Sequence, residues 1–101
     1  MKIEIKNEGD ATCAYLNGRF DTVSAAECEK DFMQLKETAD KKVIIDCTDL
    51  EYISSSGLRL FLSLRKAMDA NGGKLVIRHI NDEIRNVFTI TGFFKLFDIC
   101  Q

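Results

Sequence analysis

The sequence predicts an α/β protein: a single small domain spanning residues 1–101, with a mixed four- to five-stranded sheet and about three helices mainly on one face. Three observations support this prediction. A chain of 101 residues is long enough to bury one core but not two. Segments typical of strands alternate with segments typical of helices, which favours parallel strands joined by helical crossovers. Three helices are too few to cover both faces of a large sheet.

The chain begins with a pattern typical of a β-hairpin. Residues 2–6 alternate isoleucine with charged side chains, as in a half-buried strand. Residues 7–10 form a turn, and residues 12–16 are the returning strand. We expect the strand pattern to break at residues 18–21.

A helix and a central strand are expected next. Ser24 and Glu27 fit a capping box, in which each side chain satisfies the other residue's backbone N–H. The helix is expected to end near residues 38–40. Its apolar stripe consists of Cys28, Phe32, Leu35 and Ala39. The continuous apolar run at 43–45 predicts a central strand covered on both faces.

The stretch from Asp46 to Leu62 is the most informative part of the sequence. A polar loop is expected after the strand at 42–46, ending in three serines and a glycine before a strongly apolar segment. Serine is a good N-cap, so a helix is expected to start within residues 54–57 and to continue to about Ala70. This helix is apolar over much of its circumference, which indicates that it is buried or that one flank is a docking surface.

The last third of the chain predicts one more strand, one more helix and a short final strand. Glycines at 72–73 end the preceding helix, and residues 74–79 form the strand. Asn81 or Asp82 caps the third helix, and Gly92 ends it. A tight turn and a short last strand complete the chain.

Composition excludes several classes of function. The chain is 46% hydrophobic and 30% charged, and its net charge of −2 gives no indication of a nucleic-acid or anionic-membrane partner. The sequence shows no transmembrane run and no signal peptide, so we expect a cytoplasmic protein without direct membrane insertion. The four cysteines include no C-x-x-C pair and there is one histidine, so no metal site is expected and most cysteines should be buried apolar residues.

Catalytic motifs are missing, so no enzyme activity and no cofactor are expected. A Ser-His-Asp triad would need His79 near Ser55, and the serine run has no G-x-S-x-G elbow. No glycine-rich nucleotide-binding loop occurs. A second interpretation makes Asp46 a phosphate acceptor, with Asp49 helping to hold a metal, but the paired acids and the lysine of such a site are absent. Structural roles are favoured for His79 and for both aspartates.

The serine run itself has two interpretations. Three hydroxyls at the positive end of a helix would suit a phosphate, attached or bound. Capping alone is the simpler interpretation, and the residues by themselves favour it. The two roles are compatible, because one serine can cap the helix while its neighbour faces outward.

Four segments together resemble the STAS family, and most closely its branch of bacterial anti-sigma factor antagonists. They are Gly18–Asp21, the strand Val43–Asp46, the stretch Leu50–Leu58 and the closing Val87–Lys95. The resemblance covers nearly the whole chain, in order and with the right spacing. It therefore favours a role for the serine run beyond capping.

The resemblance implies particular roles for these residues. Ser55 matches the family's phosphorylated serine, Gly57 lets the helix start in close packing, and Asp21 matches an aspartate close to that serine. Ser54 stands where the family pattern usually has aspartate. The residues expected to bind the partner are Asp21, Ser54, Ser55, Ser56, Gly57, Leu58 and Arg59.

The function implied by the resemblance is a phosphorylation-switched binding module. The unphosphorylated protein would dock on an anti-sigma factor that is also a serine kinase, phosphorylation of Ser55 would release it, and a serine phosphatase would reset the switch. One alternative is a STAS docking subunit of a lipid-transport ABC system that works without phosphorylation. Another is a small enzyme or phosphocarrier using Ser55 or His79.

Overall fold

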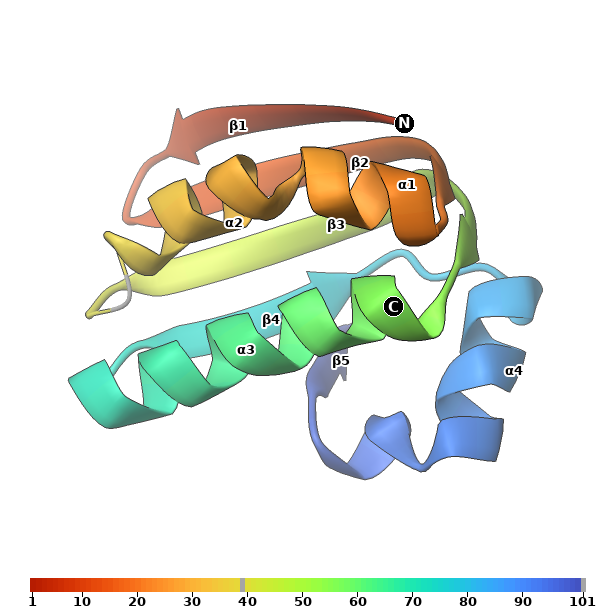
Figure 1. Cartoon of the computed structure of the whole chain (residues 1–101). Coiled ribbons are helices and arrows are strands. Elements are labelled where there is room, and N and C mark those ends of the chain that lie inside the picture. The colour runs from red at the N-terminus through yellow and green to blue at the C-terminus, as the bar shows by residue number, and fades with distance from the viewer. Residues whose placement is uncertain (39, 101) are drawn as a thin grey trace.

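The structure is a computed structural model that describes residues 1–38 and 40–100 (Figure 1). Its strands are β1 (Lys2–Glu8), β2 (Ala11–Phe20), β3 (Lys42–Ile53), β4 (Lys74–Arg78) and β5 (Asp98–Cys100). Its helices are α1 (Thr22–Glu27), α2 (Glu29–Lys36), α3 (Ser55–Asn71) and α4 (Asp82–Thr91), followed by the 3₁₀ turn η1 (Phe93–Lys95).

The strands form one five-stranded mixed sheet, as predicted. They lie in the order β1-β2-β3-β4-β5, with β1 antiparallel to β2 and every other neighbouring pair parallel. Helices α1 and α2 follow one another alongside α3 on one face of the sheet, and α4 packs beyond them against β3 and η1 (Figure 1). The predicted arrangement of helices mainly on one face is confirmed.

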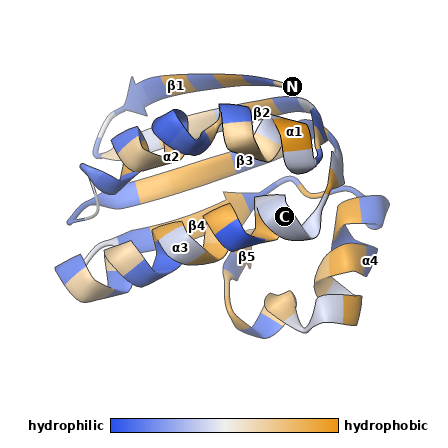
Figure 2. Ribbon diagram, in the orientation of Figure 1, coloured by the Kyte–Doolittle hydropathy of each residue, from blue (hydrophilic) through white to orange (hydrophobic). Residues whose placement is uncertain are grey.

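The core lies between this sheet and its helices. Figure 2 shows hydrophobic residues along β3, and α2 and α3 each bury apolar side chains. A cluster of aromatic rings joins the layers, with neighbouring centroids 5.8–6.5 Å apart: Phe20, Phe32, Phe61, Phe88, Phe94 and Phe97. The expectation that β3 is covered on both faces is wrong, because Ile44 is only half-buried and stays outside the core to which Val43 and Ile45 belong.

Two segments expected to be irregular are strand instead. The predicted polar loop after Asp46 continues β3 to Ile53, and the predicted break at 18–20 continues β2. These extensions pair with each other, Phe20 with Ile53, across two register shifts. An irregular ladder hides the strand pattern, because a bulge changes which side chains point to a given face.

The single helix expected to follow Ser24 is two short helices. The N-cap is Asp21, whose carboxylate accepts a hydrogen bond from the Ser24 N–H at 2.8 Å, so the predicted capping box at Ser24 is wrong. Cys28 ends α1 and precedes α2 with a backbone (φ −92°, ψ 2°) outside the helical range. Of the predicted stripe, Cys28, Phe32 and Leu35 are buried, and Ala39 lies outside the described residues.

The predicted ends of the other two helices are confirmed. Ser54 caps α3 and Asn81 caps α4, each accepting a hydrogen bond from the N–H three residues later. Gly72 and Gly92 end them in the left-handed conformation, with φ of 79° and 76°. Within the described ranges, no helix is long and apolar enough to span a membrane. Three of the four cysteines are buried, as expected, and Cys100 is exposed.

Candidate functional site

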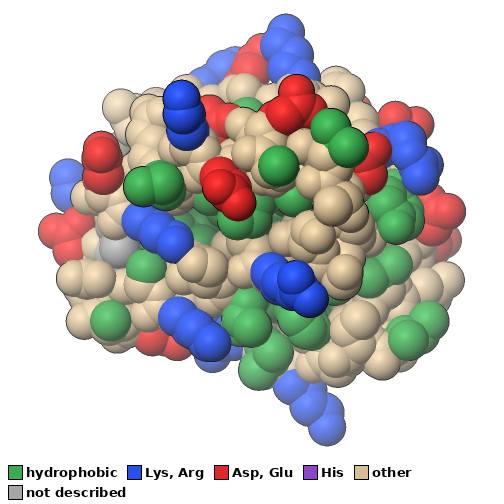
Figure 3. All heavy atoms as spheres, in the orientation of Figure 1, with side chains coloured by type: hydrophobic (Ala, Val, Ile, Leu, Met, Phe, Trp, Pro, Cys, Tyr) green, Lys and Arg blue, Asp and Glu red, His purple; other side chains and the backbone are tan. Residues whose placement is uncertain are grey.

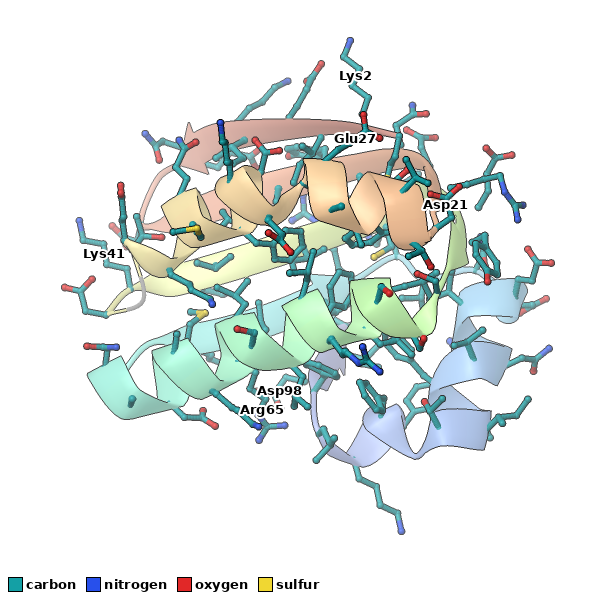
Figure 4. All side chains as sticks on the ribbon, viewed as in Figure 1. Lys2, Asp21, Glu27, Lys41, Arg65 and Asp98 are labelled. Atoms are coloured by element: carbon teal, nitrogen blue, oxygen red, sulfur yellow. The ribbon has the colours of Figure 1, made fainter. Side chains whose placement is uncertain are left out.

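The candidate site lies where β2 and β3 end and two helices begin. Phe20 pairs with Ile53 at the ends of these strands, and the Ser54 N–H donates to the Phe20 carbonyl at 2.8 Å. The next residue on each chain segment starts a helix, Asp21 as the N-cap of α1 and Ser54 as the N-cap of α3. Figure 4 shows Asp21 at the edge of the sheet from which both helices start. The pairing of two neighbouring strands therefore brings Asp21 and the serine run together.

The three serines have different environments. Ser54 is buried, and its Oγ accepts a hydrogen bond from the Gly57 N–H at 3.2 Å. Ser55 is the first residue of α3 and is exposed, whereas Ser56 is half-buried. One serine thus caps the helix while its neighbour presents a hydroxyl to solvent, as expected.

Gly57 allows α3 to start against the core. A Cβ at this position would lie 2.9 Å from Ile53 Cγ1 and 3.0 Å from Cγ and Cδ2 of Phe20. Real Cβ atoms essentially never lie so close to other atoms, so a side chain at position 57 would force its neighbours or the helix to shift. The absence of a side chain therefore sets how near the helix start comes to the sheet, and with it the position of Ser55.

Asp21 supplies a fixed negative charge beside the serines. Its carboxylate accepts hydrogen bonds from the backbone N–H of Ser24 and from the side chain of Ser24. These two bonds, the backbone one more than the other, lower the pKa of Asp21 below its ordinary value. Asp21 therefore stays ionised at neutral pH.

A shallow groove runs between α1 and the first turns of α3. It has a volume of about 300 Å³ and is lined mainly by small and apolar side chains: Thr22, Ala25, Ala26, Glu29, Ser56, Arg59 and Leu60. In Figure 3 hydrophobic side chains reach the surface between the lysines and arginines of this face. The exposed side chains of Val23 on α1 and Met33 on α2 add apolar surface to the helical layer. The groove extends the surface around Ser55 toward α1.

The seven residues expected to bind a partner are all found at this edge, but they do not all reach the surface. Ser55 and Arg59 are exposed, and Asp21 and Ser56 are half-buried. The side chain of Leu58 is 4% exposed and packs in the core, and Gly57 is buried as well. These two residues shape the site from beneath. Sequence analysis did not predict the residues that line the α1 side of the groove, because the start of α1 depends on Asp21 as its N-cap.

A second polar cluster lies away from the serines, on the helix-free side of the sheet. Asp46 accepts hydrogen bonds from the hydroxyl and N–H of Thr48, and from Arg78 Nε at 2.8 Å. His79 Nδ1 lies 3.0 Å from Thr48 Oγ1 and 3.3 Å from Asp46 Oδ2. Burial disfavours the charged carboxylate, but the bonds from Thr48 and Arg78 outweigh it, so the pKa of Asp46 lies below its ordinary value.

This cluster supports structural roles for its members. The contact of Asp46 with Arg78 joins β3 to β4, and the bonds of Asp46 with Thr48 lie within β3. His79 belongs to the same cluster and thus lies apart from Ser55, which removes the geometry a Ser-His-Asp triad would need. Among residues 1–38 and 40–100, no three His, Cys, Asp or Glu side chains are grouped so that they could hold a metal ion.

Comparisons with known proteins agree with this fold. The Bordetella bronchiseptica protein BtrV is 29% identical over 101 residues, covering 100% of this chain and 87% of that protein. A Staphylococcus aureus protein named as an anti-sigma-B factor antagonist is 26% identical over 84 residues, covering 83% of this chain and 78% of that protein. A crystal structure of a Thermotoga maritima protein has a TM-score of 0.86 at 19% identity, covering 96% of this chain and 84% of that one.

Two structures of the anti-sigma factor antagonist SpoIIAA, in different phosphorylation states, are similar to this chain. Its structure in the unphosphorylated form has a TM-score of 0.75 at 14% identity, covering 99% of this chain and 88% of that one. The structure of the Bacillus protein in the phosphorylated form has a TM-score of 0.73 at 16% identity, covering 99% of this chain and 92% of that one. At these identities the structural likeness shows the fold alone. The model of the STAS domain matches residues 2–101, and this chain belongs to the STAS domain family.

Proposed function

We propose that this protein is an anti-sigma factor antagonist, a cytoplasmic binding module without enzyme activity of its own. Unphosphorylated, it docks on an anti-sigma factor that is also a serine kinase and so frees the sigma factor. The kinase then phosphorylates Ser55, the complex dissociates, and a serine phosphatase restores the binding form. The names of the relatives support the first step, since the Staphylococcus aureus relative is named as an anti-sigma-B factor antagonist.

The exposure of Ser55 is the observation that carries the switch. Ser55 begins α3 with its side chain exposed, while the neighbouring Ser54 is committed to the cap. A kinase can therefore reach the Ser55 hydroxyl without opening the helix. Ser54 in place of the usual aspartate leaves the cap intact, because serine and aspartate are about equally good N-caps.

The energetics of phosphorylation favour a change in binding over a change in fold. A phosphate adds about −1.5 to −2 charges and three acceptor oxygens. At the exposed start of α3 the helix dipole stabilises such a charge by about 0.3–1 kcal/mol. In an interface, a desolvated and unpaired charge typically costs about 2–5 kcal/mol. At about 1.4 kcal/mol per decade, affinity falls by roughly thirty- to several-thousand-fold.

The competing proposal keeps the fold and changes the partner. A STAS subunit of a lipid-transport ABC system would dock on its ATPase without phosphorylation. The two proposals differ in the modification state of Ser55 in cells and in the genes next to this one. A kinase and a phosphatase gene would accompany the first, and permease and ATPase genes the second.

Phosphosite mass spectrometry on the protein recovered from its own cells is the direct test. We expect phosphate on Ser55 that disappears in Ser55→Ala and persists in the matched control Ser56→Ala. Partner capture should follow the same pattern, with Ser55→Ala retaining the kinase through conditions that release the wild type. An unmodified Ser55 across growth and stress conditions would favour the ABC-type docking subunit.

A further inference from the structure

We propose that Arg59 binds the phosphate of phosphorylated Ser55 within the same molecule, so that phosphorylation also withdraws this arginine from the docking surface. The inference rests on the proposed phosphorylation of Ser55. It concerns what the phosphate does once attached, which neither the kinase nor the partner determines.

The positions of the two residues on α3 suit this contact. Ser55 and Arg59 are four residues apart, one turn along the helix, and both are exposed. Side chains at this spacing are neighbours, with Cβ atoms about 5–6 Å apart. Helical side chains lean toward the N-terminus, so a long arginine side chain at position 59 can reach back toward Ser55. An acidic group that precedes the basic one by four residues is also the more favourable order.

Arg59 is available for such a contact. Four of the five arginines already have a partner: Arg78 pairs with Asp46 at 2.8 Å, Arg65 with Asp69 at 3.5 Å, and Arg19 and Arg85 lie over the rings of Tyr52 and Phe94. Within residues 1–38 and 40–100, Arg59 has no ion pair, hydrogen bond or ring contact of this kind.

The charged residues near Arg59 do not compete with a phosphate for it. The first turn of α3 contains no acidic residue. Glu29 lines the same groove as Arg59 but does not form an ion pair with it in the described part of the chain. A guanidinium matches the geometry of phosphate oxygens with two parallel donors, and such charge-assisted bonds are about twice as strong as neutral ones.

The contact would give phosphorylation two effects on binding. In the unphosphorylated protein Arg59 is an exposed cation beside the groove, open to a carboxylate of the partner. After phosphorylation the same guanidinium is engaged by its own helix. The partner then meets an added negative charge and loses a positive one, which makes the switch sharper than the phosphate charge alone.

The test measures the second ionisation of phosphoserine placed at position 55 during translation, so no kinase is required. A ³¹P NMR titration gives the pKa of this group, ordinarily about 6. A nearby guanidinium favours the doubly charged form and lowers that pKa. We expect Arg59→Gln to raise the pKa by about 0.15–0.4 pH unit. Arg59→Lys should have a smaller effect. The Arg59 Nε–H resonance should also shift when Ser55 carries the phosphate.

Lys66→Gln is the matched control. It removes one positive charge from an exposed position of the same helix, about 16 Å beyond Ser55. An unchanged pKa in Arg59→Gln, or an equal change in Lys66→Gln, would overturn the inference. Because the phosphoserine is installed directly, this result does not depend on whether Ser55 is phosphorylated in cells, and the two proposals fail separately.

Discussion

Substituting Gly57 by alanine tests whether the close approach of α3 to the sheet sets the geometry of the site. The new methyl group would lie 2.9 Å from Ile53 Cγ1 and 3.0 Å from ring atoms of Phe20. Neither neighbour can move away freely. Phe20 is fully buried, and its ring packs on Phe32 and Phe61 with centroids 5.8 and 5.9 Å away.

Two opposing effects determine the size of the change. Adding a methyl group to a filled core typically costs about 1–3 kcal/mol. Alanine favours the helix over glycine by up to about 1 kcal/mol, and less so within the first turn. We expect the packing cost to dominate and Gly57→Ala to lower the free energy of unfolding by about 1–2 kcal/mol. For a domain of this size, that lowers Tm by about 4–16 °C.

Urea unfolding followed by circular dichroism measures this change. Ser56→Ala is the control, because it replaces the neighbouring half-buried residue in the same turn and should stay within about 0.5 kcal/mol of the wild type. In an Ile53→Ala background, which removes the closest atom, Gly57→Ala should cost less than it does alone. A Gly57→Ala variant as stable as the wild type would refute the reasoning, since it would mean that the core beneath the helix has room for an additional methyl group.

Two further substitutions test the cap of α3 and the polar cluster around Asp46. Ser54→Ala should lower the free energy of unfolding by about 1 kcal/mol in the same urea assay, whereas Ser54→Asp should retain the cap, and equal losses would contradict the capping role. Asp46→Asn should remove part of the acid sensitivity of the fold, measured as the difference in unfolding free energy between pH 7 and pH 3. The lowered pKa of Asp46 means that the unfolded chain binds more protons in acid, so its stabilisation is present above about pH 4 and is lost as pH falls through the folded-state pKa. An unchanged pH difference in Asp46→Asn would show that other groups determine it.

The sequence predicted helix ends well where the deciding contacts are local. Ser54 and Asn81 each cap a helix through an N–H three residues away, and Gly72 and Gly92 end helices by their own backbone conformation. Such interactions lie within one turn, so residue type and spacing contain the necessary information.

Prediction failed where the deciding contact joins distant parts of the chain. Residues 18–20 and 47–53 are strands because they pair with each other, more than 30 residues apart and across two register shifts. Either Ser24 or Asp21 could cap a helix by residue type alone. Asp21 does so because the preceding Phe20 is held in the sheet and buried against the other aromatic rings.

The candidate site shows the same division. That a serine would cap α3 followed from the residues, whereas the proximity of Asp21 to the serine run was implied by the family resemblance. The strand pairing of Phe20 with Ile53 supplies the physical reason for it. The lack of a partner for Arg59 depends on the positions of charges across the whole described surface, which no local pattern contains.

The structure also indicates why only one serine of the three suits a change of charge. Ser54 is 9% exposed and its Oγ holds the cap, so a phosphate there would remove that bond and bury a dianion. Burying an unpaired charge costs several kcal/mol, comparable with the roughly 5–15 kcal/mol that keep a domain folded. Ser56 is half-buried and lines the groove beside α1. Ser55 alone in the run is exposed, so a charge can be added there while the cap at Ser54 and the packing at Gly57 keep the helix in place.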